Sequence, residues 1–143
     1  MPFPTRADYE AQIYGIPLRF PDEVVVSTVR LYSTSALTAR VVGTVQFANG
    51  LELRVAEFID FMVGRIRDYS YTIYQGEEKI RWYDPQPHPE NVELAATFPH
   101  HYHESPDIKH NRQPAPGLSF EVPNLPTLIA DVIMLEKSLQ PAE

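Results

Sequence analysis

The sequence predicts an α+β fold in which an antiparallel sheet of about five strands carries a short helix before it and a longer helix after it. Stretches rich in β-branched and aromatic residues follow one another, with short turns between them, from residue 24 to residue 84. Helical spacing of apolar residues occurs only at the two ends of the chain. Strands joined by short turns pair antiparallel, so we expect a meander with the C-terminal helix packed across it.

The chain of 143 residues has the size of one domain, which we expect to span residues 1–143. No apolar run approaches the roughly 20 residues that a membrane-spanning helix needs. Residues 1–6 lack the basic and apolar regions of a signal peptide. The absence of cysteine excludes disulfides and thiolate metal sites. We therefore expect a cytoplasmic protein without membrane contact.

The charge balance is acidic, with 19 acidic residues against 12 basic ones and a formal net charge of −7. A surface that coats nucleic acid without specificity would be basic, so this class of protein is disfavoured. A few arginines and lysines can still form a local phosphate site. An acidic surface also suits a basic partner protein.

The first predicted helix runs from Arg6 to Tyr14. Thr5 precedes it as a capping residue, and Asp8 in the first turn places negative charge where the helix dipole favours it. Gly15 and Pro17 are expected to end the helix.

The strands of the predicted meander are rich in valine, isoleucine, threonine and tyrosine. They span Val24–Tyr32, Ala39–Phe47, Leu51–Ile59, Arg65–Gln75 and Lys79–Asp84.

The turn after Phe47 decides which residues pair in the central hairpin. A two-residue Asn-Gly turn would place apolar Phe47 opposite Glu52. A three-residue loop keeps apolar residues together, since it pairs Phe47 with Leu51, Val45 with Leu53 and Gly43 with Val55. We predict the three-residue loop, with Gly50 in the left-handed conformation.

Residues 84–124 form a proline- and histidine-rich region that we expect to carry the function. Nine of the 14 prolines lie between Pro85 and Pro126, so long stretches must be extended or turned. Within this region Ala95–Phe98 is compatible with a short element, and His100–His103 with a short strand or an ordered loop. Ordered loops of this length are usually functional.

The last predicted helix opens near Pro126, with Asn124 or Thr127 as its cap. Seven residues of this segment recur at helical spacing, and all but Glu136 are apolar. They are Leu125, Leu128, Ile129, Val132, Ile133, Glu136 and Leu139.

All five histidines fall between His88 and His110, which gathers every side chain that titrates near pH 7 into one part of the chain. In an extended segment His101 and His103 point to one side and His100 to the other. Two imidazoles on one side, completed by a third ligand, suit zinc or another divalent ion. The candidate metal ligands are His88, His100, His101 and His103, with Asp84 as an alternative third ligand.

A metal-free alternative is phosphoryl transfer to water or to a ribose 2′-hydroxyl. One histidine would act as base and another as acid, while a cation stabilises charge on the phosphate. The available groups are Arg81, His88, His101, His103 and Lys109.

A purely structural interpretation also fits the same residues. Asp84 could begin an Asx-type turn before Pro85 and, with His88, tie the proline-rich region to the sheet. One of Trp82 and Tyr83 must face away from the core if they lie in a strand. The orientation of Glu57, toward this site or away from it, is left open by the sequence.

Several segments resemble the TumE-like proteins. The residues that carry the resemblance are Val45–Leu53, Glu57-Phe58, Tyr69-Ser70-Tyr71, Arg81–His88 and Thr97-Phe98-Pro99-His100-His101-Tyr102-His103. The family pattern has a strand ending in Arg-aromatic-Asp-Asn-x-Pro-His, followed by Thr-Phe-Pro-His-His-x-His and a C-terminal helix. In this chain Pro85 follows Asp84 in place of the usual Asn, and one extra aromatic residue separates Arg81 from Asp84.

The resemblance implies a small prokaryotic toxin that is encoded beside a helix-turn-helix antitoxin. Combined with the histidine chemistry, it leads to the hypothesis of a ribonuclease-like toxin acting on RNA. The catalytic candidates are His101 and His103 as acid/base groups or metal ligands, His88 as the opposing group, Arg81 as phosphate contact and Asp84 as orienter.

The alternative hypothesis is a metal-binding or protein-interaction domain without catalytic activity. A homodimer is compatible with either hypothesis.

Overall fold

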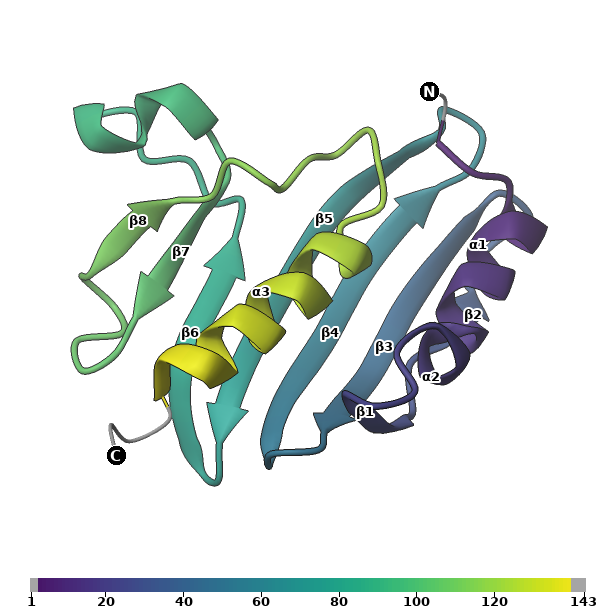
Figure 1. The fold of residues 1–143 in the computed structure, drawn as a ribbon. Helices are drawn as coiled ribbons and strands as arrows, with labels where there is room; N and C mark the ends of the chain where they lie inside the picture. The colour runs from purple at the N-terminus through teal and green to yellow at the C-terminus, as the bar shows by residue number, and fades with distance from the viewer. Residues whose placement is uncertain (1–2, 140–143) are drawn as a thin grey trace.

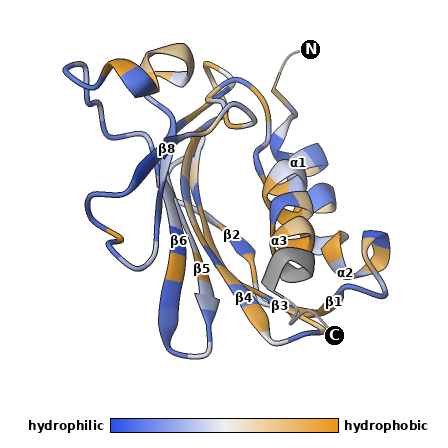
Figure 2. Ribbon diagram, turned by 60° about the vertical axis from the view of Figure 1, so that its left-hand side comes forward, coloured by the Kyte–Doolittle hydropathy of each residue, from blue (hydrophilic) through white to orange (hydrophobic). Residues whose placement is uncertain are grey.

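The computed structural model describes residues 3–139, and it describes side chains as far as residue 135. It contains one antiparallel sheet of eight strands with the α-helices on one of its faces (Figures 1 and 2). The strands are β1 (Val24–Ser27), β2 (Arg30–Ser33), β3 (Thr38–Phe47), β4 (Leu51–Asp60), β5 (Arg65–Gln75), β6 (Glu78–Asp84), β7 (His101–Glu104) and β8 (Arg112–Pro114).

The predicted α+β class is confirmed, but the prediction of about five strands is wrong. The order across the sheet is β1-β3-β4-β5-β6-β7-β8, and β2 also pairs with β3. Two of the additional strands, β7 and β8, come from the proline-rich region. They form because its prolines stand at strand ends: Pro99 precedes β7, Pro106 follows it, and Pro114 closes the edge strand β8.

A third additional strand arises because the stretch predicted as Val24–Tyr32 is broken after Ser27. Thr28 and Val29 pass so close to Gly43 that a Cβ there would lie 2.5 Å from the Thr28 carbonyl oxygen and the Val29 Cα. Gly43 has a φ of 151°, which a side chain would disfavour. The chain therefore shifts over Gly43 and continues as β2 along the same partner strand.

The central hairpin has the predicted register. Val45 pairs with Leu53 and Gly43 with Val55 across β3 and β4. Gly50 has a φ of 94°, and its N–H donates to the Phe47 carbonyl oxygen at 3.0 Å. The three-residue loop is thus confirmed, because only this register keeps the apolar residues of both strands on the buried face.

The N-terminal helix α1 (Arg6–Tyr14) is confirmed, with the Thr5 hydroxyl accepting from the Asp8 N–H at 3.2 Å. As predicted, the helix ends at Gly15, which is its C-cap, two residues before Pro17. After Gly15 the chain forms a further short helix, α2 (Ile16–Arg19). Proline is tolerated in this first turn because its missing N–H has no partner there in any case.

The C-terminal helix α3 (Leu125–Leu139) lies across the middle of the sheet (Figure 1). Asn124 occupies the predicted cap position, and its carbonyl oxygen accepts from the Leu128 N–H at 3.0 Å. Its side chain is fully buried and bonds instead to the Ser119 backbone and the Tyr71 hydroxyl. The side chains of Glu136 and Leu139, the last two of the seven residues at helical spacing, lie outside the described residues.

The two faces of the sheet differ in what covers them. We call the side that carries α1 and α3 the helix face, and the opposite side the open face (Figure 2). The core lies between the helices and the helix face, and it includes Tyr9, Ile13, Val41, Val45, Leu53, Tyr71, Ile73, Leu128, Ile129 and Val132. Because strand residues alternate, their neighbours point to the open face.

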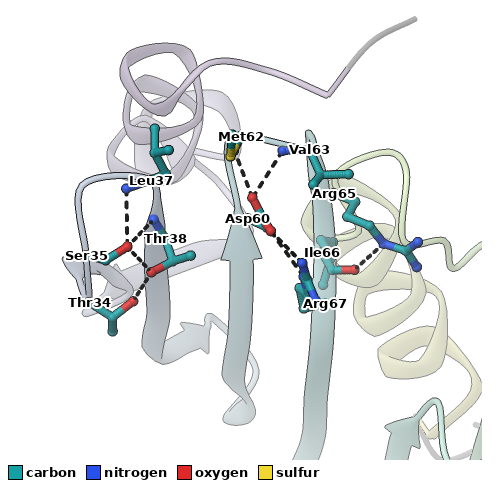
Figure 3. A network of polar contacts seen from close by, with 10 residues as sticks. All are labelled: Thr34, Ser35, Leu37, Thr38, Asp60, Met62, Val63, Arg65, Ile66 and Arg67. Atoms are coloured by element: carbon teal, nitrogen blue, oxygen red, sulfur yellow. Dashed lines mark hydrogen bonds and ion pairs between the residues drawn. The ribbon is translucent and has the colours of Figure 1, made fainter.

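Polar networks fix the end of β4 and the turn before β3 (Figure 3). Asp60 accepts from the Met62 and Val63 N–H groups at 3.0 and 3.1 Å and from Arg67 at 2.8 Å. These donors stabilise the carboxylate and lower the pKa of Asp60, the Val63 N–H contributing most. The β4–β5 turn is therefore fixed by hydrogen bonds to one carboxylate.

Candidate functional site: a carboxylate and two imidazoles on the open face

The pairing of β6 with β7 brings together residues that are far apart in the sequence. Asp84 lies opposite His101, and Trp82 lies opposite His103. Directly paired residues share a face, and Trp82 also pairs with Thr72 rather than with the buried tyrosines of β5. These four side chains therefore belong to the open face.

Asp84, His101 and His103 converge on a common centre, which we call the triad. The His101 and His103 Nε2 atoms are 3.1 Å apart. His103 Nε2 is 3.0 Å from Asp84 Oδ2, and His101 Nε2 is 3.3 Å from Asp84 Oδ1. The three residues are only 6%, 1% and 4% exposed in the order given, so they are withdrawn from bulk water.

The orientation of His101 is fixed by the chain just before it. Its Nδ1 lies 3.1 Å from the Pro99 carbonyl oxygen, which can only accept. The ring hydrogen of neutral His101 is therefore on Nδ1, and Nε2 presents a lone pair to the triad. Burial lowers the pKa of His101, which favours this neutral form.

Aromatic rings pack against both imidazoles. Trp82 stacks on His103 with ring centres 4.8 Å apart, and its indole N–H donates to the Ser70 hydroxyl. His88 meets His101 edge-on at 4.9 Å. The side chain of His88 is 12% exposed, so it is more accessible than the imidazoles of His101 and His103. His88 thus lies between the triad and solvent.

Asp84 also performs the structural role that the sequence suggested. Its Oδ1 accepts from the Gln86 N–H at 2.8 Å, as an Asx-type turn requires. The turn directs the chain away from β6 at Pro85. The same carboxylate therefore shapes the backbone and faces both imidazoles.

His100 does not join the triad. It points to the other side of β7, where Nδ1 lies 2.6 Å from the Tyr69 hydroxyl and its ring stacks on Tyr69. His110 is exposed and pairs with Asp107 at 3.1 Å. Among the described residues, the set that could hold a metal ion is Asp84, His101 and His103. The candidate ligands His100 and His88 are outside that set.

Arg81 lies on the helix face, away from the imidazoles. It pairs with Ile73 across β5 and β6, and its guanidinium bonds to Glu104 at 2.5 Å and covers the Tyr102 ring. It also lines a cavity of about 240 Å³ that includes Asp131 of α3. The predicted grouping of Arg81 with the histidines is therefore wrong in space.

A different arginine occupies the position expected of Arg81. Arg112 of β8 lies directly opposite His103 and thus on the open face. Its Nε is buried and has no hydrogen-bond partner within the described part of the chain. Sequence reasoning missed it because the pairing of β7 with β8 depends on the intervening turn, which carries no recognisable pattern.

Glu57 belongs to the helix face, so it does not contribute to the triad. It is buried between β3 and β5 and accepts hydrogen bonds from the Tyr9 and Tyr71 hydroxyls. Burial raises the pKa of Glu57 to about 7, against the lowering effect of the two hydroxyls. Glu57 on the helix face and Asp84 on the open face are thus both buried carboxyl groups.

Together these features define an α+β protein with a buried carboxylate–imidazole centre on the open face, near one edge of the sheet. Comparison with protein families identifies it further: the family model described as Toxin TumE matches residues 16–138. The chain belongs to the TumE toxin family, and this membership implies a toxin–antitoxin system with an antitoxin as partner. No curated protein and no solved structure matches the chain. No helix in residues 3–139 is long and apolar enough to cross a membrane.

Proposed function

We propose that this toxin acts by cleaving RNA at the triad. The observation that carries the proposal is the convergence of Asp84, His101 and His103 on the open face, with Arg112 beside His103. An arginine next to imidazoles is the combination that phosphoryl transfer uses, since the guanidinium binds a phosphate oxygen in a fixed geometry. Arg112 takes the role of phosphate contact that the sequence assigned to Arg81.

The open face supports RNA as the substrate class. Cations lie over aromatic rings at three places along it: Arg40 over Phe58, Arg54 over Tyr74 and Lys79 over Trp82. Sheets that bind single-stranded RNA combine aromatic rings, on which bases stack, with arginines and lysines for the backbone. In a chain with net charge −7, these pairs place three cations on the open face, of which Arg54 also forms an ion pair with Glu52 at 2.8 Å.

The roles in the reaction follow from exposure. The attacking hydroxyl, of water or of a ribose, loses a proton as its oxygen bonds to phosphorus. The P–O bond to the leaving nucleotide breaks, and the leaving oxygen takes up a proton. His88, which contacts His101 and is more exposed than either imidazole of the triad, is the candidate for these proton transfers. Arg112 stabilises the charge on the phosphate, and Asp84 orients the imidazoles.

Inducible expression tests the proposal. Wild type is compared with His103→Gln, and His110→Gln serves as the matched control because His110 is exposed and outside the triad. We expect growth arrest and fragmented RNA with wild type and with the control, but not with His103→Gln. Circular dichroism verifies that the variants are folded. Intact RNA in all three strains would overturn the ribonuclease proposal.

The antitoxin in this proposal is a helix-turn-helix protein encoded next to the toxin, and both act in the cytoplasm, where RNA is the target. Co-expression tests it: the antitoxin should co-purify with the toxin and restore growth. Co-purification with RNA intact in every strain would instead favour a protein-interaction domain. Light scattering of the toxin alone tests the homodimer.

A further inference from the structure

We infer that Asp84, His101 and His103 bind a divalent transition-metal ion, for which Zn²⁺ is the probe. The inference deepens the proposed function because it concerns the same site, and it rests on that proposal only for its role in RNA cleavage. Metal binding itself can be measured without RNA, so the two can fail separately.

The distances within the triad are those that a metal ion imposes on its ligands. An ion about 2.0–2.1 Å from each ligand atom holds tetrahedral ligands about 3.4 Å apart and octahedral ligands about 2.9 Å apart. The Nε2 atoms of His101 and His103 are 3.1 Å apart. His103 Nε2 lies 3.0 Å from Asp84 Oδ2, and His101 Nε2 lies 3.3 Å from the other oxygen, Asp84 Oδ1. One ligand atom from each residue lies within 4.8 Å of the other two, so a single ion can contact both imidazole nitrogens and one oxygen of Asp84.

The count of hydrogens also favours a cation at this centre. The lone pair of His101 Nε2 and both Asp84 oxygens face the centre, because His101 carries its hydrogen on Nδ1. His103 Nε2 can donate one hydrogen, and two acceptors are within reach of it: Asp84 Oδ2 and His101 Nε2. The lone pair of His101 still faces Asp84 Oδ1 at 3.3 Å with no hydrogen between them. A metal ion would take up the lone pairs of both Nε2 atoms and of Asp84, and the ring hydrogen of His103 would then lie on Nδ1, which has no hydrogen-bond partner within the described residues.

Groups outside the triad hold these ligands in place. The Pro99 carbonyl oxygen fixes the His101 ring, an arrangement found at most metal-binding histidines. The Gln86 N–H holds the Asp84 carboxylate, and Trp82 stacks on the His103 ring. The site is therefore preorganised, which lowers the cost of binding.

The chemistry of the ligands selects the kind of ion. Two imidazoles and one carboxylate suit Zn²⁺ and other first-row transition metals rather than Ca²⁺ or Mg²⁺, which prefer oxygen ligands. Three protein ligands leave at least one coordination position open. In the proposed function that position would accept a phosphate oxygen or water, while His101 and His103 serve as ligands and His88 stays free for proton transfer.

The test uses full-length protein without a histidine tag, stripped of metal and titrated with Zn²⁺ by isothermal calorimetry. We expect about one Zn²⁺ per chain, and binding at least about 100-fold weaker in His103→Ala and Asp84→Asn. The Asp84→Asn variant retains the oxygen that accepts from Gln86, so it keeps the turn. Controls are His100→Ala and His110→Ala, which remove neighbouring histidines outside the triad and should bind like wild type.

Three results would overturn the inference: no stoichiometric Zn²⁺ in wild type, unchanged affinity in Asp84→Asn, or loss of binding in the His110 control. If His103→Ala fails to fold, thermal unfolding decides, since Zn²⁺ should raise the Tm of wild type and not that of Asp84→Asn. If Zn²⁺ binds but RNA stays intact, the metal site is supported and the ribonuclease proposal is refuted. RNA cleavage that survives chelation would support the ribonuclease and show that the metal ion has no role in the reaction.

Discussion

His103 and Arg112 lie directly opposite each other where β7 pairs with β8, and both belong to the open face of the sheet. Arg81 and Glu104 form the corresponding pair on the helix face, one strand away. The two arginines are thus separated by the sheet itself. One accompanies the triad, and the other holds two strands together beside α3.

The two arginines should respond differently to the same substitution. Arg112→Gln is expected to lower the rate of RNA cleavage by about 100-fold, the effect of removing one donor to a phosphate or oxyanion. Arg81→Gln should leave the rate unchanged, because Arg81 bonds to Glu104. Initial rates of the purified variants on RNA measure both. Equal losses in the two variants would refute the assignment of Arg112.

The stability of the protein should depend on pH through Glu57. Its pKa rises from 4.5 to about 7 on folding, so the folded state binds the proton more tightly than the unfolded chain. The stabilising contribution is complete below the unfolded pKa and is lost as pH rises through about 7. The change is up to about 3 kcal/mol, at about 1.4 kcal/mol for each pKa unit.

The matched variant for this prediction is Glu57→Gln, which keeps the shape of the side chain but cannot titrate. Unfolding free energies of both proteins are measured by urea denaturation from pH 4.5 to 8. As pH rises, the unfolding free energy of the wild type should fall relative to that of the variant. A difference that stays constant with pH would show that Glu57 does not titrate as described.

The close passage of the chain over Gly43 predicts a costly substitution. Gly43→Ala should lower the unfolding free energy by about 1–3 kcal/mol from backbone strain, and further because Thr28 and Val29 must move. Gly50→Ala is the control, since Gly50 also has a positive φ but has no atom within 4 Å of an added Cβ. Equal losses at the two glycines, measured by urea denaturation, would exclude the contact as the cause.

The packing of α3 on the sheet should depend on Leu128, which is fully buried. Leu128→Ala is expected to cost about 2–5 kcal/mol, because it removes buried methyl groups and leaves a cavity. Met134 on the same helix is 64% exposed, so Met134→Ala should change the unfolding free energy by less than about 0.5 kcal/mol. Thermal unfolding of both variants measures the contrast.

The sequence predicted the parts of the fold that depend on local pattern. The register of the β3–β4 hairpin follows from keeping apolar residues paired, and α1 follows from its cap at Thr5. The shared side of His101 and His103 follows from strand alternation alone. What the sequence did not predict are contacts that need a partner strand, such as Arg112 beside His103.

The misplacement of Arg81 has a simpler reason. Arg81 and Asp84 are three residues apart in one strand, so alternation already directs them to opposite faces. The extra aromatic residue between them produces this odd spacing. The break between β1 and β2, in contrast, depends on the close contact of Thr28 and Val29 with Gly43 in another strand. No local sequence pattern predicts that contact.

The four residues of β7 leave no room for a change in length. The side chains of His101 and His103 lie on the open face. On the helix face Tyr102 packs on Tyr83, and Glu104 forms an ion pair with Arg81. A single inserted or deleted residue inside the strand would exchange the two sets. Among homologous toxins, length variation should therefore collect in the segments before and after the strand, while the stretch from His101 to Glu104 keeps its spacing.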